Sequence, residues 1–166
     1  MDEFIWITDP HYNRVTKNQI VEHFQELKIK NPKGIFLTGD ISNGTNLKEH
    51  LELLADLDIP IYFCLGNHDI YNLSFKEAND IVRLLCKTYD NLFYLNDCKP
   101  MLLSNKVALI GQNGWYDARY LKPISNLIFA HDSFYIKDFS WLLWLIVFKK
   151  ILILCSFMCY TVNIWF

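Results

Sequence analysis

The sequence has little that suggests a disulfide-stabilised or zinc-ribbon protein. It has an odd number of cysteines, and the only close pair lies inside an apolar run; the five are Cys64, Cys86, Cys98, Cys155 and Cys159. Without paired spacing, neither a disulfide framework nor a cysteine zinc site is expected. This cysteine usage fits a reducing compartment, so we expect a cytoplasmic location.

A surplus of positive charge and the pattern of a signal peptide are not found in the sequence either. The net charge is −2, which gives no general attraction to a phosphate backbone, so a nucleic-acid partner is not expected. The opening residues, MDEFIWITD, contain neither a basic region nor a long apolar stretch, and they do not resemble a signal peptide. The length of 166 residues is enough for one domain with its own core.

Short apolar runs alternate with helical patterns over the first ninety residues. Helix starts resembling capping boxes occur at Thr16, Asn46 and Ser74, each followed three residues later by Gln or Glu. Continuously apolar strands separated by helices predict an α/β domain with a parallel sheet and right-handed crossovers. Two later runs, 100–104 and 106–111, predict a hairpin. The strands expected in the sheet span residues 4–8, 34–38 and 59–65.

Polar residues of related chemistry follow each of these three strands. The carboxyl ends of neighbouring parallel strands meet at one edge of a sheet, so the three loops are expected to form a single site. Any one of these motifs alone could be an ordinary turn, but recurrence after three strands favours a shared site. The residues concerned are Asp9 and His11, then Asp40, then Asn67, His68 and Asp69.

The side chains in these loops suit metal-ion chemistry. Oxygen and imidazole donors together favour Mn, Fe, Zn or Ni over Mg or Ca. A carboxylate such as Asp40 can bridge two ions about 3.5–4 Å apart, which is the geometry of two-metal phosphoryl transfer. His68 can contact a phosphate oxygen or protonate a leaving group, and Asp69 can fix the tautomer of His68.

The motifs Asp9-Pro10-His11, Gly39-Asp40 and Gly66-Asn67-His68-Asp69 resemble those of the calcineurin-like metallophosphoesterases. The resemblance implies hydrolysis of a phosphate ester by metal-activated water, with two divalent metal ions. It assigns Asp9 and His11 to the first metal, Asp40 to both metals and Asn67 to the second. It places His68 against the phosphate with Asp69 behind it. Residues 1–138 would then form the N-terminal portion of a four-layer αββα sandwich, of which only the first half is complete.

The sequence also departs from the family pattern after the third motif. The family's G-H-x-H motif is absent, and the only histidine after His68 is His131, which is expected to be structural. Asn43 replaces the last aspartate of GD-x-x-D, and is expected either near the second metal or shaping the turn. The second metal therefore has few ligands, and the alternative function is a non-catalytic, truncated remnant of the family. His23 and His50 have no motif and are expected to be solvated.

Residues 139–166 form a separate hydrophobic tail. A helix over 141–166 would be about 39 Å long, enough to cross a bilayer, although Lys149 and Lys150 would be costly inside it. Membrane association through this tail is therefore one alternative. The others are a strand pair packed in the core and the product of out-of-frame translation. The sequence alone leaves all three open.

Overall fold

A parallel sheet forms the centre of the fold. The structure is a computed structural model that describes residues 3–113, 132–139 and 161–165. The strand order is β1-β2-β3-β4, so strands that follow one another in the chain are also neighbours in the sheet. The three predicted strands are confirmed, whereas the fourth is only three residues long and gave no sequence signal. The bounds are β1 (Phe4–Ile7), β2 (Gly34–Thr38), β3 (Ile61–Cys64) and β4 (Leu92–Tyr94).

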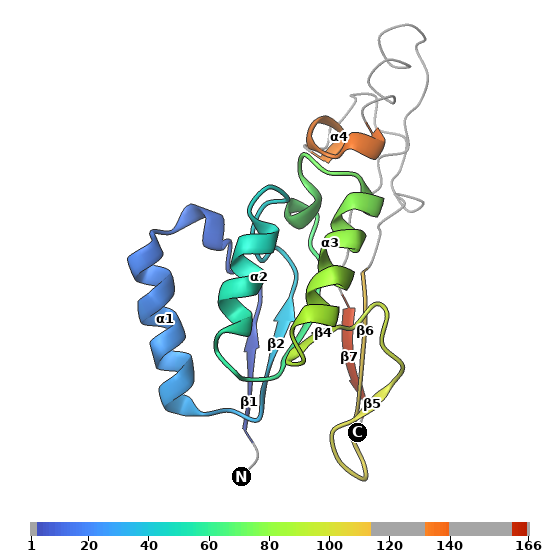
Figure 1. Ribbon diagram of the computed structural model, residues 1–166. Helices are drawn as coiled ribbons and strands as arrows, with labels where there is room; N and C mark the ends of the chain where they lie inside the picture. The colour runs from blue at the N-terminus through green and yellow to red at the C-terminus, as the bar shows by residue number, and fades with distance from the viewer. Residues whose placement is uncertain (1–2, 114–131, 140–160, 166) are drawn as a thin grey trace, which may run out of the picture.

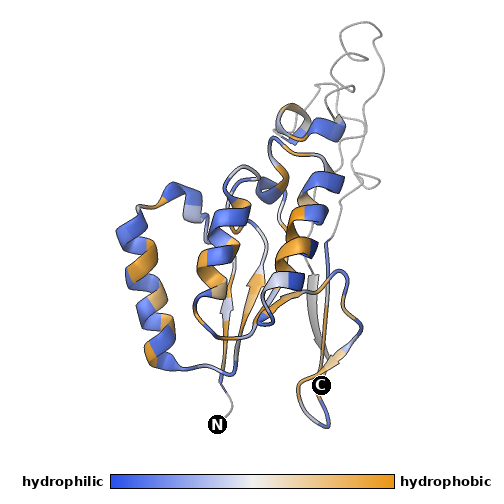
Figure 2. Ribbon diagram, viewed as in Figure 1, coloured by the Kyte–Doolittle hydropathy of each residue, from blue (hydrophilic) through white to orange (hydrophobic). Residues whose placement is uncertain are grey.

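Three helices connect these strands and cover one face of the sheet. With sequential strand order, right-handed crossovers all place their helices on the same side. The predicted capping boxes at Thr16 and Ser74 are confirmed, but the side chain of Asn46 makes no capping hydrogen bond. Figure 1 shows the helices in front of the sheet, and Figure 2 shows their alternating apolar and polar positions. Their bounds are α1 (Lys17–Lys30), α2 (Leu47–Ala55) and α3 (Phe75–Thr88).

The two faces of the parallel sheet differ in chemistry. Alternate residues of a strand point to opposite faces. On the helix-covered face, Leu37 and Phe63 are among the strand residues with no exposed surface. The opposite face is aromatic: Phe4 stacks on Phe36 with ring centroids 4.9 Å apart, and Trp6 is 72% exposed.

A second, antiparallel sheet packs against the aromatic face. Its strands are β5 (Met101–Leu102), β6 (Ala108–Gln112) and β7 (Thr161–Trp165), in the order β5-β6-β7. The predicted hairpin is therefore confirmed. Leu109 of β6 is fully buried in a cluster with Phe36 and Cys64. A Cβ at Gly111 would lie 2.6 Å from the side chain of Leu95, which shows how closely β6 approaches the first sheet.

The hydrophobic tail is described only at its end. Thr161–Trp165 is a strand that pairs with β6, whereas residues 140–160 lie outside the described residues. The membrane helix, the core strand pair and the out-of-frame product therefore stay predictions for that stretch. Within the described ranges, no helix combines the length and apolar character needed to cross a membrane.

The expected solvation of His50 is wrong. His50 is buried, and its Nδ1 lies 2.6 Å from Oγ of Ser42, which has no exposed surface. The apolar stripe of α2 faces the sheet, and His50 falls on this inner side. His23 is half-buried.

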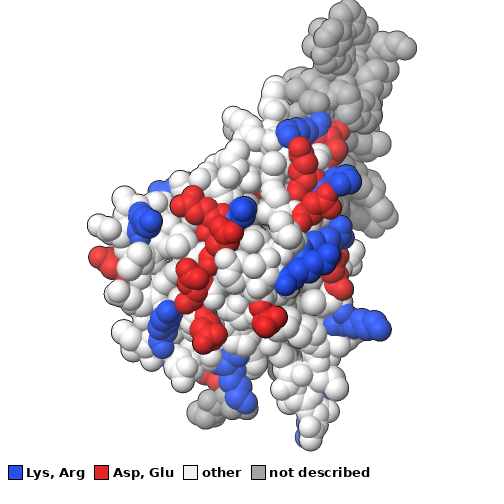
Figure 3. Space-filling model, viewed as in Figure 1, with Lys and Arg blue, Asp and Glu red and all other residues white. Residues whose placement is uncertain are grey.

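The charged residues of α3 lie mainly in mixed pairs on its outer side. Lys137 contacts Glu77 at 2.9 Å, and Arg83 contacts Asp97 at 2.6 Å. Figure 3 shows positive and negative side chains interspersed over the region of α3. Such exposed pairs contribute little to stability, about 0–1 kcal/mol each.

Candidate metal centre

Three loops at the carboxyl ends of β1, β2 and β3 meet at one edge of the sheet, as expected from the parallel order. The loop after β1 carries Asp9 and His11, the loop after β2 carries Asp40, and the loop after β3 carries Asn67 and His68. Backbone hydrogen bonds join the first two loops: the His11 amide donates to the Asp40 carbonyl at 3.0 Å.

The backbone at this edge adopts uncommon conformations. Asp9, His11 and Asp40 all have positive φ, at 49°, 45° and 48°. Non-glycine residues rarely occupy this region, and such conformations concentrate at functional sites. Gly66 is needed for a different reason, because a Cβ there would overlap the carboxylate and backbone nitrogen of Asp40. Glycine thus allows the third loop to approach the second.

Asp40 stands between two imidazoles. His11 Nε2 lies 3.6 Å and His68 Nε2 lies 3.8 Å from the same oxygen, Asp40 Oδ2. The other oxygen, Oδ1, accepts a hydrogen bond from the His68 backbone amide at 3.1 Å, which fixes the carboxylate's orientation. One ligand atom from each of the three residues lies within 4.8 Å of the others. Such a group can hold a metal ion.

Burial governs the protonation of this group. Burial raises the pKa of Asp40, while the neighbouring His68 and His11 and the His68 amide oppose the rise. Burial also lowers the pKa of His68, against the charge of Asp40, and this favours the neutral imidazole that metals require. A bound cation would reverse the direction for Asp40, because positive charge stabilises the carboxylate.

The residues present fit a transition-metal ion. Their donors are one buried carboxylate and two imidazoles, the mixture that suits Mn, Fe, Zn or Ni. His11 Nδ1 is buried without a hydrogen-bond partner in the described part of the chain, and Nε2 of the same ring faces Asp40. In this group His68 occupies a position from which it can ligate a metal, whereas the family resemblance implies a contact with the phosphate.

The other predicted ligands lie beside this group. Asp9 is exposed, accepts a hydrogen bond from Thr8 Oγ1, and is near enough for its charge to raise the pKa of Asp40. The amide nitrogen of Asn67 donates to Asp132 Oδ1 at 2.7 Å and to the Tyr71 hydroxyl at 3.2 Å. The group of three contains two of the four predicted ligands, His11 and Asp40.

Asp69 contacts the backbone of two loops. It is fully buried, and its oxygens accept hydrogen bonds from the backbone amides of Ser42 at 2.8 Å and Gly66 at 2.7 Å. Burial raises its pKa to about 7, against those two amides. The carboxylate thus ties the second loop to the third. A contact between Asp69 and the His68 ring stays a prediction.

Two neighbours of Asn67 were missed by sequence reasoning. Asp132 belongs to the short helix α4 (Asp132–Tyr135), and Tyr71 follows the 3₁₀ helix η2 (His68–Ile70). Asp132 begins the stretch DSFYIKDFSW, which resembles the family only softly, and its neighbour His131 lies outside the described residues. Asn43 accepts hydrogen bonds from Thr45 Oγ1 and the Asn46 amide, which fits the turn-shaping alternative.

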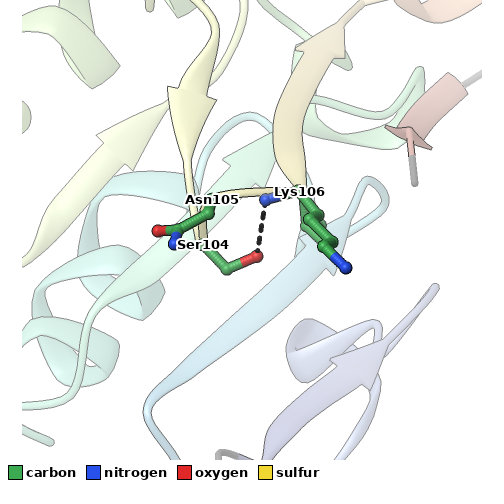
Figure 4. Close-up of a pocket in the computed structure, with 4 residues that line it drawn as sticks. Ser104, Asn105 and Lys106 are labelled. Carbon is green, nitrogen blue, oxygen red and sulfur yellow. Dashed lines mark hydrogen bonds between the residues drawn. The ribbon is translucent and has the colours of Figure 1, made fainter.

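A surface pocket lies elsewhere, at the tip of the β5–β6 hairpin. It is lined by Ser104, Asn105, Lys106 and Val107, and the Lys106 amide donates to Ser104 Oγ at 3.2 Å (Figure 4). This tip is at the opposite end of the strands from the three loops (Figure 1). The pocket has one amine and no second titratable side chain. It therefore offers no chemistry comparable to that at the loop edge, the edge of the sheet where the loops after β1, β2 and β3 meet.

Comparison with known proteins agrees with the site. The sequence model of the Calcineurin-like phosphoesterase (Metallophos) family matches residues 3–149, which includes all three motifs and continues past residue 138. Searches of curated proteins and of solved structures found no match. Since the family match covers most of the 166 residues, the chain belongs to the calcineurin-like phosphoesterases.

Proposed function

We propose that this chain is a metal-dependent phosphoesterase that hydrolyses a phosphate ester with a water molecule as the nucleophile. The observation that carries the proposal is the convergence of His11, Asp40 and His68, from three separate loops, to within 4.8 Å. Members of this family are metal-dependent phosphoester hydrolases, and the donor types suit such an ion.

The residues divide into ligands and a phosphate contact. Asp9, His11 and Asp40 would hold the first ion, and Asp40 with Asn67 would provide donors for a second. When bound, such ions lower the pKa of a water molecule and neutralise phosphate charge. His68 contacts the phosphate oxygens, because its Nε2, 3.8 Å from Asp40 Oδ2, lies beside the proposed ligands. When protonated, it can also donate a proton to the leaving group.

The finer fold assignment is also part of this proposal. The helices, the parallel sheet and the sheet β5-β6-β7 form three successive layers of an αββα sandwich. The burial of Leu109 against Phe36 and Cys64 supports this stacking of two sheets.

Substitution of Asp40 tests the proposal most directly. Asp40→Asn keeps the size of the side chain and, like Asp, tolerates the positive φ of 48°. We expect it to weaken Mn²⁺ binding in calorimetric titration and to reduce Mn²⁺-dependent hydrolysis of an aryl phosphate. Because changes behind a metal ligand already cost about 10–100-fold, loss of the shared ligand should cost at least about 100-fold.

A matched control for Asp40→Asn is available in the same chain. Asp58 is exposed, also has a positive φ of 58°, and precedes β3 at the other end of the sheet. Asp58→Asn should leave both Mn²⁺ affinity and hydrolysis unchanged. Equal behaviour of the Asp40 and Asp58 variants would overturn the proposed function.

His68→Ala separates a phosphate contact from a metal ligand. If His68 contacts phosphate, the variant keeps its Mn²⁺ affinity and loses hydrolysis. A fall in Mn²⁺ affinity as large as that of His11→Ala would instead make His68 a ligand. The two measurements, titration and turnover, are made on the same preparations.

A second candidate function is a non-catalytic family member. The absence of a G-H-x-H motif after His68 favours it, because imidazole ligands of the second metal are then missing. Such a protein would bind Mn²⁺ through the loop edge but show no hydrolysis of aryl phosphates. Binding without turnover, lost in Asp40→Asn, would select this candidate.

A further inference from the structure

A buried carboxylate from a distant part of the chain contacts the loop after β3. Asp132 is 5% exposed and lies 65 residues after Asn67 in the sequence. One of its oxygens, Oδ1, accepts two hydrogen bonds, from Asn67 Nδ2 at 2.7 Å and from the Tyr71 hydroxyl at 2.7 Å. Asn67 Nδ2 also donates to the Tyr71 hydroxyl, so the three side chains form a closed triangle.

The segment that carries Asp132 is held firmly against this loop. The Tyr71 ring stacks on the ring of Tyr135 with centroids 4.9 Å apart. Backbone hydrogen bonds join Asn72 to the Tyr135 carbonyl at 2.6 Å and Lys137 to the Leu73 carbonyl at 3.0 Å. In Figure 1, α4 accordingly lies over the N-terminal end of α3. Asp132 therefore has a fixed position relative to Asn67.

The chemistry of the contact decides how the Asn67 amide is turned. An ionised carboxylate only accepts hydrogen bonds, so the group facing Asp132 must be the NH₂ of Asn67. The carbonyl oxygen Oδ1 is then the corner of the planar amide that points away from Asp132. An amide that could flip would present NH₂ hydrogens where a cation needs an oxygen.

We propose that Asp132 is a positioning residue that fixes the Asn67 amide with its oxygen as the metal-ligating atom. Tyr71 supports Asp132 by donating to the same oxygen, and its ring also lies 4.4 Å from the His68 ring. This inference rests on the proposed function, because it requires Asn67 to be a ligand.

The test compares three variants by calorimetric titration with Mn²⁺ alone. Asp132→Leu removes the acceptor at similar size, Asn67→Ala removes the ligand, and the third variant combines both. We expect each single variant to weaken Mn²⁺ binding about 10–100-fold, as changes behind a metal ligand do. The double variant should be no weaker than Asn67→Ala, because Asp132 acts only through Asn67.

Two further variants exclude a purely structural effect. Asp132→Asn keeps an acceptor oxygen and should restore Mn²⁺ affinity to within about threefold of the wild type. Asp138 accepts from the Phe75 amide at 2.6 Å, so Asp138→Ala weakens the attachment of the same segment without touching Asn67. It should lower thermal stability but leave Mn²⁺ affinity unchanged. If Asp132→Leu does not fold, Asp132→Ala takes its place in the comparison.

The outcomes distinguish this inference from the proposed function. Wild-type Mn²⁺ affinity in Asp132→Leu, or an additive loss in the double variant, overturns the positioning role. No effect of Asn67→Ala overturns it too, while a loss in Asp40→Asn would still support the phosphoesterase proposal. Equal Mn²⁺ affinity of wild type and Asp40→Asn overturns the proposed function itself.

Discussion

The two faces of the parallel sheet are completed in different ways. The helix-covered face is built from neighbouring βα units, and Ile35, Leu37, Ile61 and Phe63 have no exposed surface there. The aromatic face is covered by strands from residues 101–112 and 161–165, and it leaves Trp6 72% exposed. One face is thus buried by helices that are next to its strands in the sequence. The other face is covered by segments far along the chain. The three loops of the candidate metal centre lie at the edge of the sheet, between these two faces.

The largest expected effect comes from a core deletion on the helix-covered face. Leu37→Ala should lower the free energy of unfolding by about 2–5 kcal/mol, because it removes buried methyl groups and leaves a cavity. Trp6→Ala on the aromatic face should cost at most about 1 kcal/mol, since the Trp6 side chain is largely exposed and, among the described residues, its indole donates one hydrogen bond, to Thr38 Oγ1. Urea unfolding of both variants measures the difference. If Trp6→Ala lowered the free energy of unfolding as much as Leu37→Ala does, the aromatic face around Trp6 would be buried in solution.

A smaller effect is expected where the second sheet approaches the first. Gly111→Ala would place a Cβ 2.6 Å from Leu95 and 2.9 Å from Cys64 Sγ, so β6 or its neighbours must move. Overpacking of this kind costs about 1–3 kcal/mol. The measurement is again urea unfolding, with Mn²⁺ titration alongside it. Because the loop edge is built on β1 to β3, the Mn²⁺ affinity of Gly111→Ala should be unchanged. If this variant were as stable as the wild type, the two sheets would not pack this closely.

The sequence predicted the elements whose signals are local. Capping boxes at Thr16 and Ser74 and apolar runs at 34–38 and 59–65 located helices and strands correctly. The three-residue strand β4 was missed, because so short a run has no periodicity, and its place is set by pairing with β3. The hydroxyl partner of His50 was missed because an inward-facing polar side chain looks like a solvated one in sequence.

At the loop edge, too, some features could be predicted from the sequence and others depend on contacts formed only in the fold. His11 and Asp40 were brought together as expected, because parallel strands carry their loops to one edge regardless of side-chain detail. The contacts of Asp69 and Asn67 could not be predicted. Asp69 pairs with backbone amides exposed only by the loop conformations, and Asn67 pairs with Asp132, which the topology brings from 65 residues away.

The smallest expected effect is a change in the pH dependence of stability, on the helix-covered face. Burial lowers the pKa of His50 below its ordinary value, so the unfolded chain binds the proton more readily than the folded chain. Stability from the neutral ring is therefore present above pH 6.5, the unfolded value, and is lost as pH falls below it.

The comparison that isolates His50 is between the wild type and His50→Asn at two pH values. Asn cannot take up a proton, and it keeps a polar atom for the Ser42 hydroxyl, which lies 2.6 Å from His50 Nδ1. The free energy of unfolding should fall less between pH 7.5 and pH 5.5 in the variant, as measured with urea. Other groups titrate in this range in both proteins, so only the difference between the two proteins is attributed to His50. If the free energy of unfolding falls equally in both proteins between the two pH values, the His50 ring reaches solvent. The helix-covered face would then be less tightly packed than its apolar residues indicate.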